Sequence, residues 1–348
     1  MSLAETKNRI AWVDMAKGYG MFAVIIAHIV YSGPLHAWIY TFHMPLFFFL
    51  SGYVFSNKDK FDLFIKKKAK ALLIPYFILG IPMIVFKVLF SLYQKTFTID
   101  STIELVKNFV FQKRLWTLWY IACLFFLNII FYLVTKFAKK NISKAVIVIA
   151  MAFIGLVYYK SGGLPLPWNI DACFMAIPFF FGGYVLKQNS DKVDKLLTQN
   201  KNKVLLFFAF GLINVVFGYL NIRTTGKGLE MFDSEYANPL FAYVSAFAGV
   251  FAVVIFSRFF SLKPIKFIGE NSLVYYAWHQ TIMIPITTII FGYLGFQESY
   301  DIYQPYYWCY KLVQFAVILI ILTIPTVIIE KTNLRVLLGK RKINKYII

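Results

Sequence analysis

The sequence predicts an all-α polytopic membrane protein with about ten transmembrane helices. Of the 348 residues, 59% are hydrophobic and 20% are aromatic, whereas only 15% are charged, a composition unlike that of a soluble globular domain. The apolar residues gather in stretches long enough to cross a bilayer. Lys and Arg residues are also distributed unevenly between the connecting segments, as expected for a protein that follows the positive-inside rule.

Ten apolar stretches have, or approach, the length of a transmembrane helix. They are residues 11–31, 37–55, 72–93, 116–135, 145–159, 172–186, 204–222, 237–257, 272–292 and 306–329. The fifth and sixth are short, so we expect them to be tilted, broken or longer than drawn. No internal repeat is evident, and residues 1–348 are expected to form one domain with a short basic tail at 331–348.

The placement of basic residues predicts the orientation. With both termini in the cytoplasm, 26 Lys and Arg residues fall in inner segments and 7 in outer loops. This bias favours cytoplasmic termini and a multi-pass protein of a cell membrane, which we expect to be a bacterial inner or plasma membrane. The net charge of +20 does not indicate nucleic acid, because the basic residues are spread over many segments instead of forming one footprint.

The first hairpin, residues 10–56, carries the most informative ionisable residues. Asp14, Lys17, His28 and His43 interrupt its apolar sequence. Such a group costs several kcal/mol inside a spanning helix, so it usually faces a cavity or a partner and serves function. Lys17 and His28 are eleven residues apart, which places them within about 20° of one helix face and about 16 Å apart along the axis. Asp14 precedes Lys17 by three residues and can pair with it.

Several later residues have two interpretations each. Lys66, Lys67 and Lys70, in the basic loop 57–70, are either orientation signals or a funnel for a phosphate-bearing cosubstrate. Trp119 fits an interfacial aromatic belt or a substrate contact. Asp171 either caps a helix or contacts an external substrate. His279 lies within the ninth apolar stretch and is either functional or bonded to a backbone carbonyl.

The candidate chemistry is general acid–base catalysis. The sequence contains no serine-hydrolase elbow, no phosphate-binding P-loop and no metal-binding motif. The four histidines have no carboxylate ligands near them in the sequence, so we expect no metal. An imidazole with an ordinary pKa near 6.5 suits the deprotonation of a sugar hydroxyl.

These motifs, taken together, resemble the acyltransferase-3 family of integral membrane acyltransferases, and within it the branch described as fucose 4-O-acetylase-like. The resemblance covers essentially the whole chain. It is carried by D-x-x-K-G (14–18) with His28, FHMPLFFFLSGY (42–53), the basic run into LLIPYF (66–77), LWYI (118–121), PFFFGGY (178–184) after Asp171, and IGENSLVYYAWH (268–279). The family usually has Arg where this chain has Lys17. The positive charge is kept, but two-pronged guanidinium recognition of phosphate is lost.

The resemblance implies transfer of an acyl group, usually acetyl, from cytoplasmic acyl-CoA to a hydroxyl of a carbohydrate or cell-envelope glycan. Acetyl-CoA would be the cosubstrate. His28 is expected to be the general base, with His43 as a second candidate for orienting the acceptor or shuttling a proton, and Asp14 positioning Lys17. The CoA phosphates would be held by Lys17, Lys66, Lys67 and Lys70. Further substrate contacts are assigned to Trp119, Asp171 and His279.

Two other function classes are compatible with the hydropathy. A secondary transporter or flippase for a sugar or lipid-linked glycan would also use intramembrane ionisable residues, but it usually shows inverted repeats and paired broken helices. A membrane scaffold or sensor would not need Lys17 and His28 on one stripe. The sequence leaves open the acceptor, acetyl against succinyl, direct transfer against an acyl-histidine, the side of the membrane where transfer occurs, and the oligomeric state, a homo-oligomer included.

Overall fold

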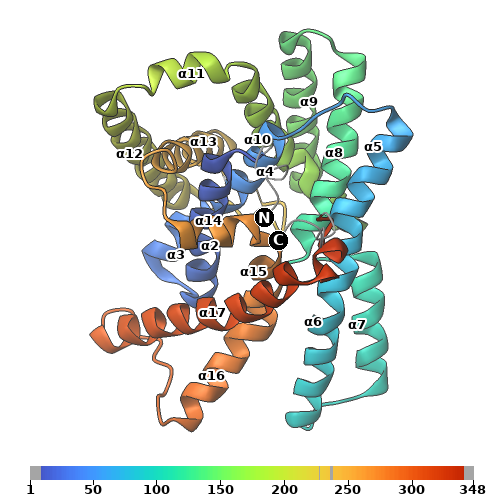
Figure 1. The fold of residues 1–348 in the computed structure, drawn as a ribbon, viewed down its shortest axis with the longest axis vertical. Helices are drawn as coiled ribbons and strands as arrows, with labels where there is room; N and C mark the ends of the chain where they lie inside the picture. Colours follow the sequence, from blue (N-terminus) through green and yellow to red (C-terminus); the bar gives the residue numbers. More distant parts are fainter. Residues whose placement is uncertain (1–8, 227, 236–237, 341–348) are drawn as a thin grey trace.

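The computed structural model describes residues 9–226, 228–235 and 238–340. Within these residues the regular structure is helical, apart from one isolated bridge between Glu230 and Glu235. The all-α fold class is therefore confirmed. Figure 1 shows α2 and α4 in the middle of the molecule, with α12 and α13 on one side and α6 and α8 on the other.

The helices differ widely in length, and short ones connect the long ones. They are α2 (Ala11–Ile29), α3 (Gly33–Tyr40), α4 (His43–Tyr53), α5 (Phe61–Lys68), α6 (Ile74–Tyr93), α7 (Ile99–Phe111), α8 (Trp119–Phe137), α9 (Asn141–Lys160), α10 (Ile170–Gln188), α11 (Ser190–Leu196), α12 (Asn200–Thr225), α13 (Pro239–Phe256), α14 (Lys263–Glu270), α15 (Ser272–Trp278), α16 (Ile284–Tyr293) and α17 (Pro305–Lys331). Two π-helical turns (Ala69–Leu73 and His279–Met283) and two 3-10 turns (Pro167–Asn169 and Asn333–Leu338) complete the set.

Seven helical stretches in the described part of the chain are long and apolar enough to cross a membrane. They cover seven of the predicted spans, and the fifth and sixth are longer than drawn, with 20 and 19 residues in α9 and α10. The other three predicted spans coincide with α2, with the pair α3 and α4, and with the run from α15 to α16. The multi-pass membrane class is confirmed, whereas the count of ten and the orientation stay predictions.

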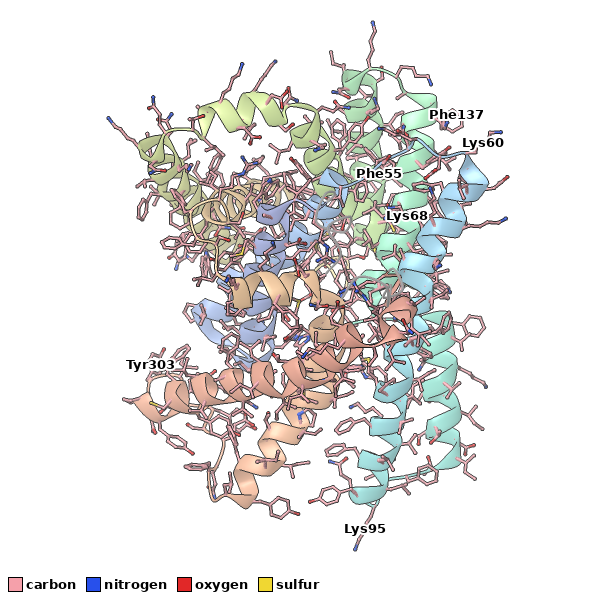
Figure 2. All side chains as sticks on the ribbon, in the orientation of Figure 1. Phe55, Lys60, Lys68, Lys95, Phe137 and Tyr303 are labelled. Atoms are coloured by element: carbon pink, nitrogen blue, oxygen red, sulfur yellow. The ribbon has the colours of Figure 1, made fainter. Side chains whose placement is uncertain are left out.

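The basic segment after α4 is not the loop that the sequence indicated. Most of it forms α5, which continues through a π turn into α6 as one run of 33 residues. At about 1.5 Å per residue this run is about 50 Å long, more than the roughly 30 Å of a bilayer's hydrocarbon core. Lys60 and Lys95 mark its two ends (Figure 2). The apolar part can therefore span the membrane while the basic part, α5, extends beyond it.

Each π turn is followed by an Ile-Pro pair, Ile74-Pro75 and Ile284-Pro285. The amide of Ile284 donates to the carbonyl of His279, five residues back, and Ile74 does the same to Ala69. A proline inside a helix lacks an N–H donor, and its ring clashes with the carbonyl four residues earlier. The wider turn accommodates the proline without ending the helix, and such turns occur frequently at functional sites.

Glycines allow the central helices to approach each other closely. A Cβ added at Gly52 of α4 would lie 1.8 Å from the Phe180 carbonyl oxygen of α10, and one at Gly183 of α10 would lie 1.8 Å from the Phe49 oxygen of α4. In the same way, Gly269 of α14 packs on the backbone of α2, where an added Cβ would lie 1.8 Å from the carbonyl oxygen of Asp14. These contacts fix α2 and α4 against their neighbours and so fix the side chains that the two helices carry.

Candidate active site

A cavity of about 360 Å³ lies beside the His28 end of α2. Its walls come from α2, the α3–α4 junction, the start of α8, the α15 region and two connecting loops, and they include His28, Tyr40, His43, Arg114, Trp119 and Tyr276. The volume is that of a small-ligand site, and the lining combines aromatic rings with a few polar groups, as such sites do.

The junction between α3 and α4 places His43 in this cavity. Phe42 leaves the helical conformation, with φ −136° and ψ −18°, and α4 begins at His43. The Nδ1 atom of His43 lies 3.0 Å from the carbonyl oxygen of Ile39. Because a carbonyl oxygen only accepts, Nδ1 carries a proton and donates it. The backbone therefore fixes Nδ1 of His43, and in the neutral imidazole Nε2 is the nitrogen that can accept.

His28 lines the same cavity and is less constrained. Its ring centroid lies 5.0 Å from that of His279 and 6.4 Å from that of Tyr40. In the described part of the chain no hydrogen bond fixes its tautomer, in contrast to His43 and His279. Either ring nitrogen can therefore take up a proton, as a general base requires.

His279 stands behind His28, at the first residue of the second π turn. Its Nδ1 donates to the carbonyl oxygens of Tyr275 and Tyr276, at 3.0 and 2.9 Å. Its Nε2 is buried and has no hydrogen-bond partner within the described residues. The backbone bond that the sequence analysis considered is present, and it leaves the other nitrogen as an unused acceptor beside His28. A buried polar atom without a partner is rare in proteins and asks for an explanation.

Lys17 lies at a second, smaller cavity of about 130 Å³. This cavity is lined by Lys17, Ser51, Tyr120 and Tyr276 among others, and Tyr276 also lines the His28 cavity. The Nζ of Lys17 is 3.8 Å from the Asp14 carboxylate, the pairing expected from their spacing. The other oxygen of Asp14 is buried and accepts no hydrogen bond from the part of the chain that the structure describes. Lys17 thus lines one cavity, His28 lines the other, and Tyr276 lines both.

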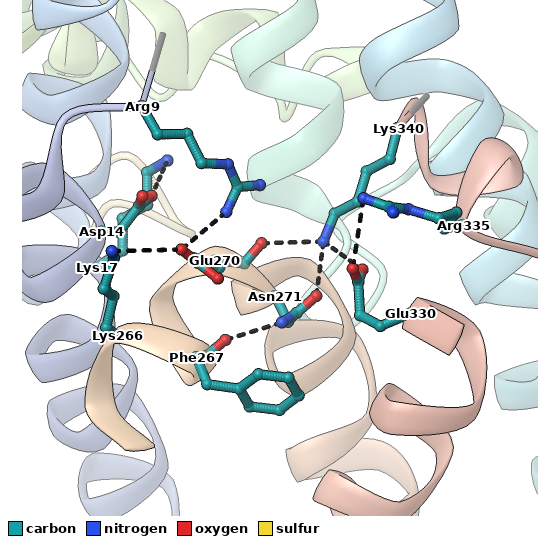
Figure 3. Close-up of polar contacts among 10 residues, drawn as sticks. All are labelled: Arg9, Asp14, Lys17, Lys266, Phe267, Glu270, Asn271, Glu330, Arg335 and Lys340. Atoms are coloured by element: carbon teal, nitrogen blue, oxygen red, sulfur yellow. Dashed lines mark hydrogen bonds and ion pairs between the residues drawn. The ribbon is translucent and has the colours of Figure 1, made fainter. Parts of the chain in front are cut away.

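A network of charged side chains surrounds the Lys17 end of α2 (Figure 3). Glu270 pairs with Arg9 at 3.3 Å and with Lys266 at 3.9 Å. Lys340 donates to the Glu270 carbonyl oxygen, to Asn271 and to Glu330. Burial lowers the pKa of Lys340, while its bond to Glu330 acts in the opposite direction. The network holds more cations than carboxylates: Arg9, Lys17, Lys266, Arg335 and Lys340 against Asp14, Glu270 and Glu330.

The other lysines assigned to the donor lie apart from these cavities. Lys66, Lys67 and Lys70 are exposed on α5 and its π turn, and Lys67 pairs with Asp59 at 2.7 Å. They line neither cavity. The cations that do gather near Lys17 come from other segments. Arg9 lies just before α2, and Lys340 lies more than 300 residues later, so the basic-loop pattern did not reveal them.

Asp171 reaches the His28 cavity only through Arg114. Its carboxylate is buried and forms an ion pair with Arg114, accepts from Ser234 Oγ at 2.8 Å, and accepts from the Leu166 amide at 3.3 Å. Arg114 lines the cavity and is also 3.6 Å from Asp233. Asp171 therefore ties the loop before α8 to the loop before α13, and it does not itself line the cavity.

Sequence reasoning missed several lining residues, Arg114, Tyr40 and Glu230 in particular. Glu230 accepts from the Phe232 amide at 3.2 Å, and burial raises its pKa to about 7. The sequence did contain a signal for Arg114. Only 7 basic residues fall in the predicted outer loops, and because the positive-inside rule disfavours basic residues there, each of them is a candidate for another role. Trp119, by contrast, was singled out. It is buried, packs on Phe48 and lines the cavity instead of facing lipid.

Comparison with known proteins gives one match. The family model described as an acyltransferase domain, of the acyltransferase-3 type, matches residues 10–329. This range includes both cavities but not Arg9, Glu330, Arg335 and Lys340 of the charged network. No curated protein and no solved structure matches the chain. No group of three or more His, Cys, Asp or Glu side chains suited to a metal ion occurs within the described residues.

Proposed function

Because the chain belongs to the acyltransferase-3 family, we propose that it is a membrane O-acyltransferase that moves an acetyl group from acetyl-CoA to a hydroxyl of a carbohydrate or cell-envelope glycan. One observation carries the proposal. Tyr276 lines both the cavity that holds Lys17 and the cavity that holds His28. A cation site and a base site therefore share a wall, as a long anionic donor with a reactive tip requires.

The donor enters from the Lys17 end. CoA carries several negative charges, which cannot enter lipid, so its phosphates stay with the cations around Lys17, including Arg9 and Lys340. The thin pantetheine arm passes Tyr276 and Tyr120 toward His28. The rise between Lys17 and His28 is about 16 Å, a distance that an extended arm can cover. With cytoplasmic termini, as the charge bias favours, this end opens to the cytoplasm. Lys66, Lys67 and Lys70 then attract the donor over a longer range.

His28 acts as the general base in a single transfer step. It accepts the proton of the acceptor hydroxyl as that oxygen attacks the thioester carbonyl carbon. The carbon–oxygen bond of the new ester forms, the carbon–sulfur bond breaks, and the proton passes from His28 to the departing CoA thiolate. The step needs no further reactant, and His28 ends in its starting state.

Five further residues support the reaction. The unused Nε2 of His279 accepts the N–H of the His28 imidazolium and so orients it, the arrangement by which a base is usually held. His43 offers its Nε2 to the acceptor hydroxyl. Asp14 holds Lys17. Trp119 forms a wall for the sugar, and Asp171 positions Arg114 there.

The test separates binding from chemistry. Acetyl-CoA affinity and CoA release are measured on the detergent-purified chain and on Lys17→Met, His28→Ala and Lys107→Met. Lys17→Met loses a charged contact with the donor, so its affinity for acetyl-CoA should be about tenfold to hundredfold lower than that of the wild type. His28→Ala should bind acetyl-CoA normally but release CoA at least about a hundredfold more slowly. Lys107→Met, which removes an exposed lysine of α7, is the control for charge and should match the wild type.

Two outcomes would reject the proposal. If the wild-type chain has no affinity for any acyl-CoA, the alternative of a transporter or flippase becomes the better one, and the same variants belong in uptake assays. If Lys107→Met weakens binding as much as Lys17→Met, the donor responds to net charge and not to the cavity at Lys17. Replacing acetyl-CoA by succinyl-CoA in the same assay decides the acyl group.

A further inference from the structure

A third cavity adjoins the His28 cavity on the side away from Lys17. It has a volume of about 310 Å³ and lies between α3 and the segment after α12. Tyr40 and Glu230 line both this cavity and the His28 cavity. The proposed reaction occupies only the His28 cavity, which leaves the third cavity without a role.

The third cavity carries groups that bind hydroxyls. His36 lines it and donates its Nδ1 proton to the carbonyl oxygens of Ala27 and Val30, at 2.9 and 2.8 Å, so Nε2 is the nitrogen left for a ligand, as an acceptor when the ring is neutral. The ring of Tyr40 lies against that of His36 at a tilt of 32°, with centroids 4.2 Å apart, and also contacts His43 edge-on, with centroids 4.7 Å apart. The aromatic wall is therefore continuous from the third cavity to the His28 cavity.

Glu230 stands where the two cavities meet. Its backbone bridges to Glu235, and among the described residues its side chain accepts one hydrogen bond, from the Phe232 amide. A carboxylate has about four acceptor positions, so most of its capacity is left for a ligand. With burial raising its pKa to about 7, both the donor and the acceptor form of this carboxyl are present near neutral pH.

We propose that the acceptor is a glycan of at least two sugar units, with the reacting unit in the His28 cavity, its neighbour in the third cavity, and Glu230 holding hydroxyls of both. This inference rests on the proposed acyltransferase function and narrows its substrate. Each cavity alone is at the lower end of the range for ligand sites, about 300–1,000 Å³. Aromatic faces beside a few carboxyl and imidazole groups match the apolar faces and the hydroxyls of a sugar.

The experiment compares short and long acceptors in the wild type and in a variant whose third cavity is filled. Methyl glycosides of hexoses, 6-deoxyhexoses and N-acetylhexosamines are compared with their homodisaccharides as acceptors from acetyl-CoA, and the readout is the disaccharide-to-monosaccharide ratio of kcat/KM. Gly228→Val fills the third cavity, because a Cβ there meets only the Ala37 carbonyl oxygen, at 4.0 Å. Gly211→Val in α12 is the matched control, since its Cβ meets nothing within 4 Å.

In the wild type and in Gly211→Val, the ratio should be about ten or more for at least one sugar, the effect of one or two added hydrogen bonds. Gly228→Val should bring the ratio close to one, and Glu230→Gln should lower it by part of that amount. A wild-type ratio near one, or an unchanged ratio in Gly228→Val, overturns the proposal. Transfer to no glycoside, with acetyl-CoA still bound and hydrolysed, also overturns it but leaves the acyltransferase function standing.

Discussion

The two ends of α2 are built in different ways. Around Lys17 the side chains are charged and already paired, and the adjoining cavity is small, about 130 Å³. Around His28 the lining is dominated by imidazole and aromatic groups, and the cavity is about 360 Å³. The first end suits recognition of a charge and passage of a narrow chain. The second suits a ligand distinguished by shape and by hydroxyl positions.

The backbone differs between these ends as well. At the Lys17 end, helices pack directly against each other, as α14 does on α2 through Gly269. At the His28 end, loops form part of the wall, and Gln112, Arg114 and Trp116 all have positive φ, between 44° and 48°. Such conformations are uncommon outside glycine and persist only where the surroundings hold them. The wall at the His28 end therefore depends on hydrogen bonds and ion pairs between side chains more than on helix packing.

The largest expected effect comes from breaking those bonds. Asp171→Asn removes the buried charge that holds the largely buried Arg114, and loss of one partner of a buried pair costs about 3–5 kcal/mol. The midpoint of thermal unfolding in detergent should fall accordingly. Asp59→Asn is the control, because this aspartate pairs with the exposed Lys67 at the surface, and an exposed pair contributes about 1 kcal/mol or less. Equal falls in melting temperature in the two variants would contradict the view that the ion pair in the loops at the His28 end contributes more stability than a surface pair.

The counterpart at the Lys17 end is Gly269→Ala. The added Cβ would meet the Asp14 carbonyl oxygen at 1.8 Å, so α14 must move away from α2. Overpacking of this kind costs about 1–3 kcal/mol, and we expect the upper part of that range together with weaker acetyl-CoA binding. Gly292→Ala in α16, where a Cβ meets nothing within 4 Å, should leave both quantities unchanged. If acetyl-CoA affinity survives in Gly269→Ala, the donor does not depend on the α2–α14 contact.

A smaller effect is expected from the orienting residue. His279→Leu removes the acceptor nitrogen beside His28, and we expect kcat to fall about a hundredfold, the lower end of what acid–base catalysis contributes. His279→Gln, whose side-chain oxygen can replace Nε2 as acceptor, should lose only about tenfold. The KM for acetyl-CoA should be unchanged in both. A rise in KM without a change in kcat would indicate that His279 supports the cavity and does not orient His28.

The smallest effect is a pH dependence of stability at Glu230. Its folded-state pKa of about 7 lies above the ordinary 4.5. The stability that this group contributes is therefore complete below pH 4.5 and is lost as the pH rises through 7. Glu230→Gln does not titrate, so its advantage in melting temperature over the wild type should grow between pH 4.5 and 7 and then level off. A difference that is constant over this range would show that Glu230 is not buried as described.

Much of the Lys17 end of α2 was predictable from the sequence. A cation, a carboxylate three residues earlier and an imidazole eleven residues later on one apolar stretch define a stripe, because helix geometry fixes where each side chain lies. The structure places Lys17 beside Asp14 and places His28 at the next cavity, as the stripe requires. The catalytic and binding roles of these residues stay predictions.

The His28 end was harder to predict from the sequence, because its residues meet through contacts between segments far apart in the chain. Arg114, Asp171 and Ser234 come from three separate segments, and no periodic pattern links them. Likewise, Lys340 reaches Glu270 across 70 positions. A single sequence reveals helices through their periodicity, but loops that fold onto each other leave no such pattern.

The π turn at His279 has a consequence for insertions and deletions. One extra residue in a helical turn changes the angular phase of everything after it by about 100°, so the segment from Ser272 to His279 and the segment from Ile284 onward are out of phase. This offset lets His279 contact His28 while α16 packs on α17, and Pro285 favours it because a proline fits the wider turn. Deletion of Ile282, or replacement of Pro285 by Ala, would favour a regular helix. His279 and α16 could then no longer keep both contacts, although no ring or charge at the site had been altered.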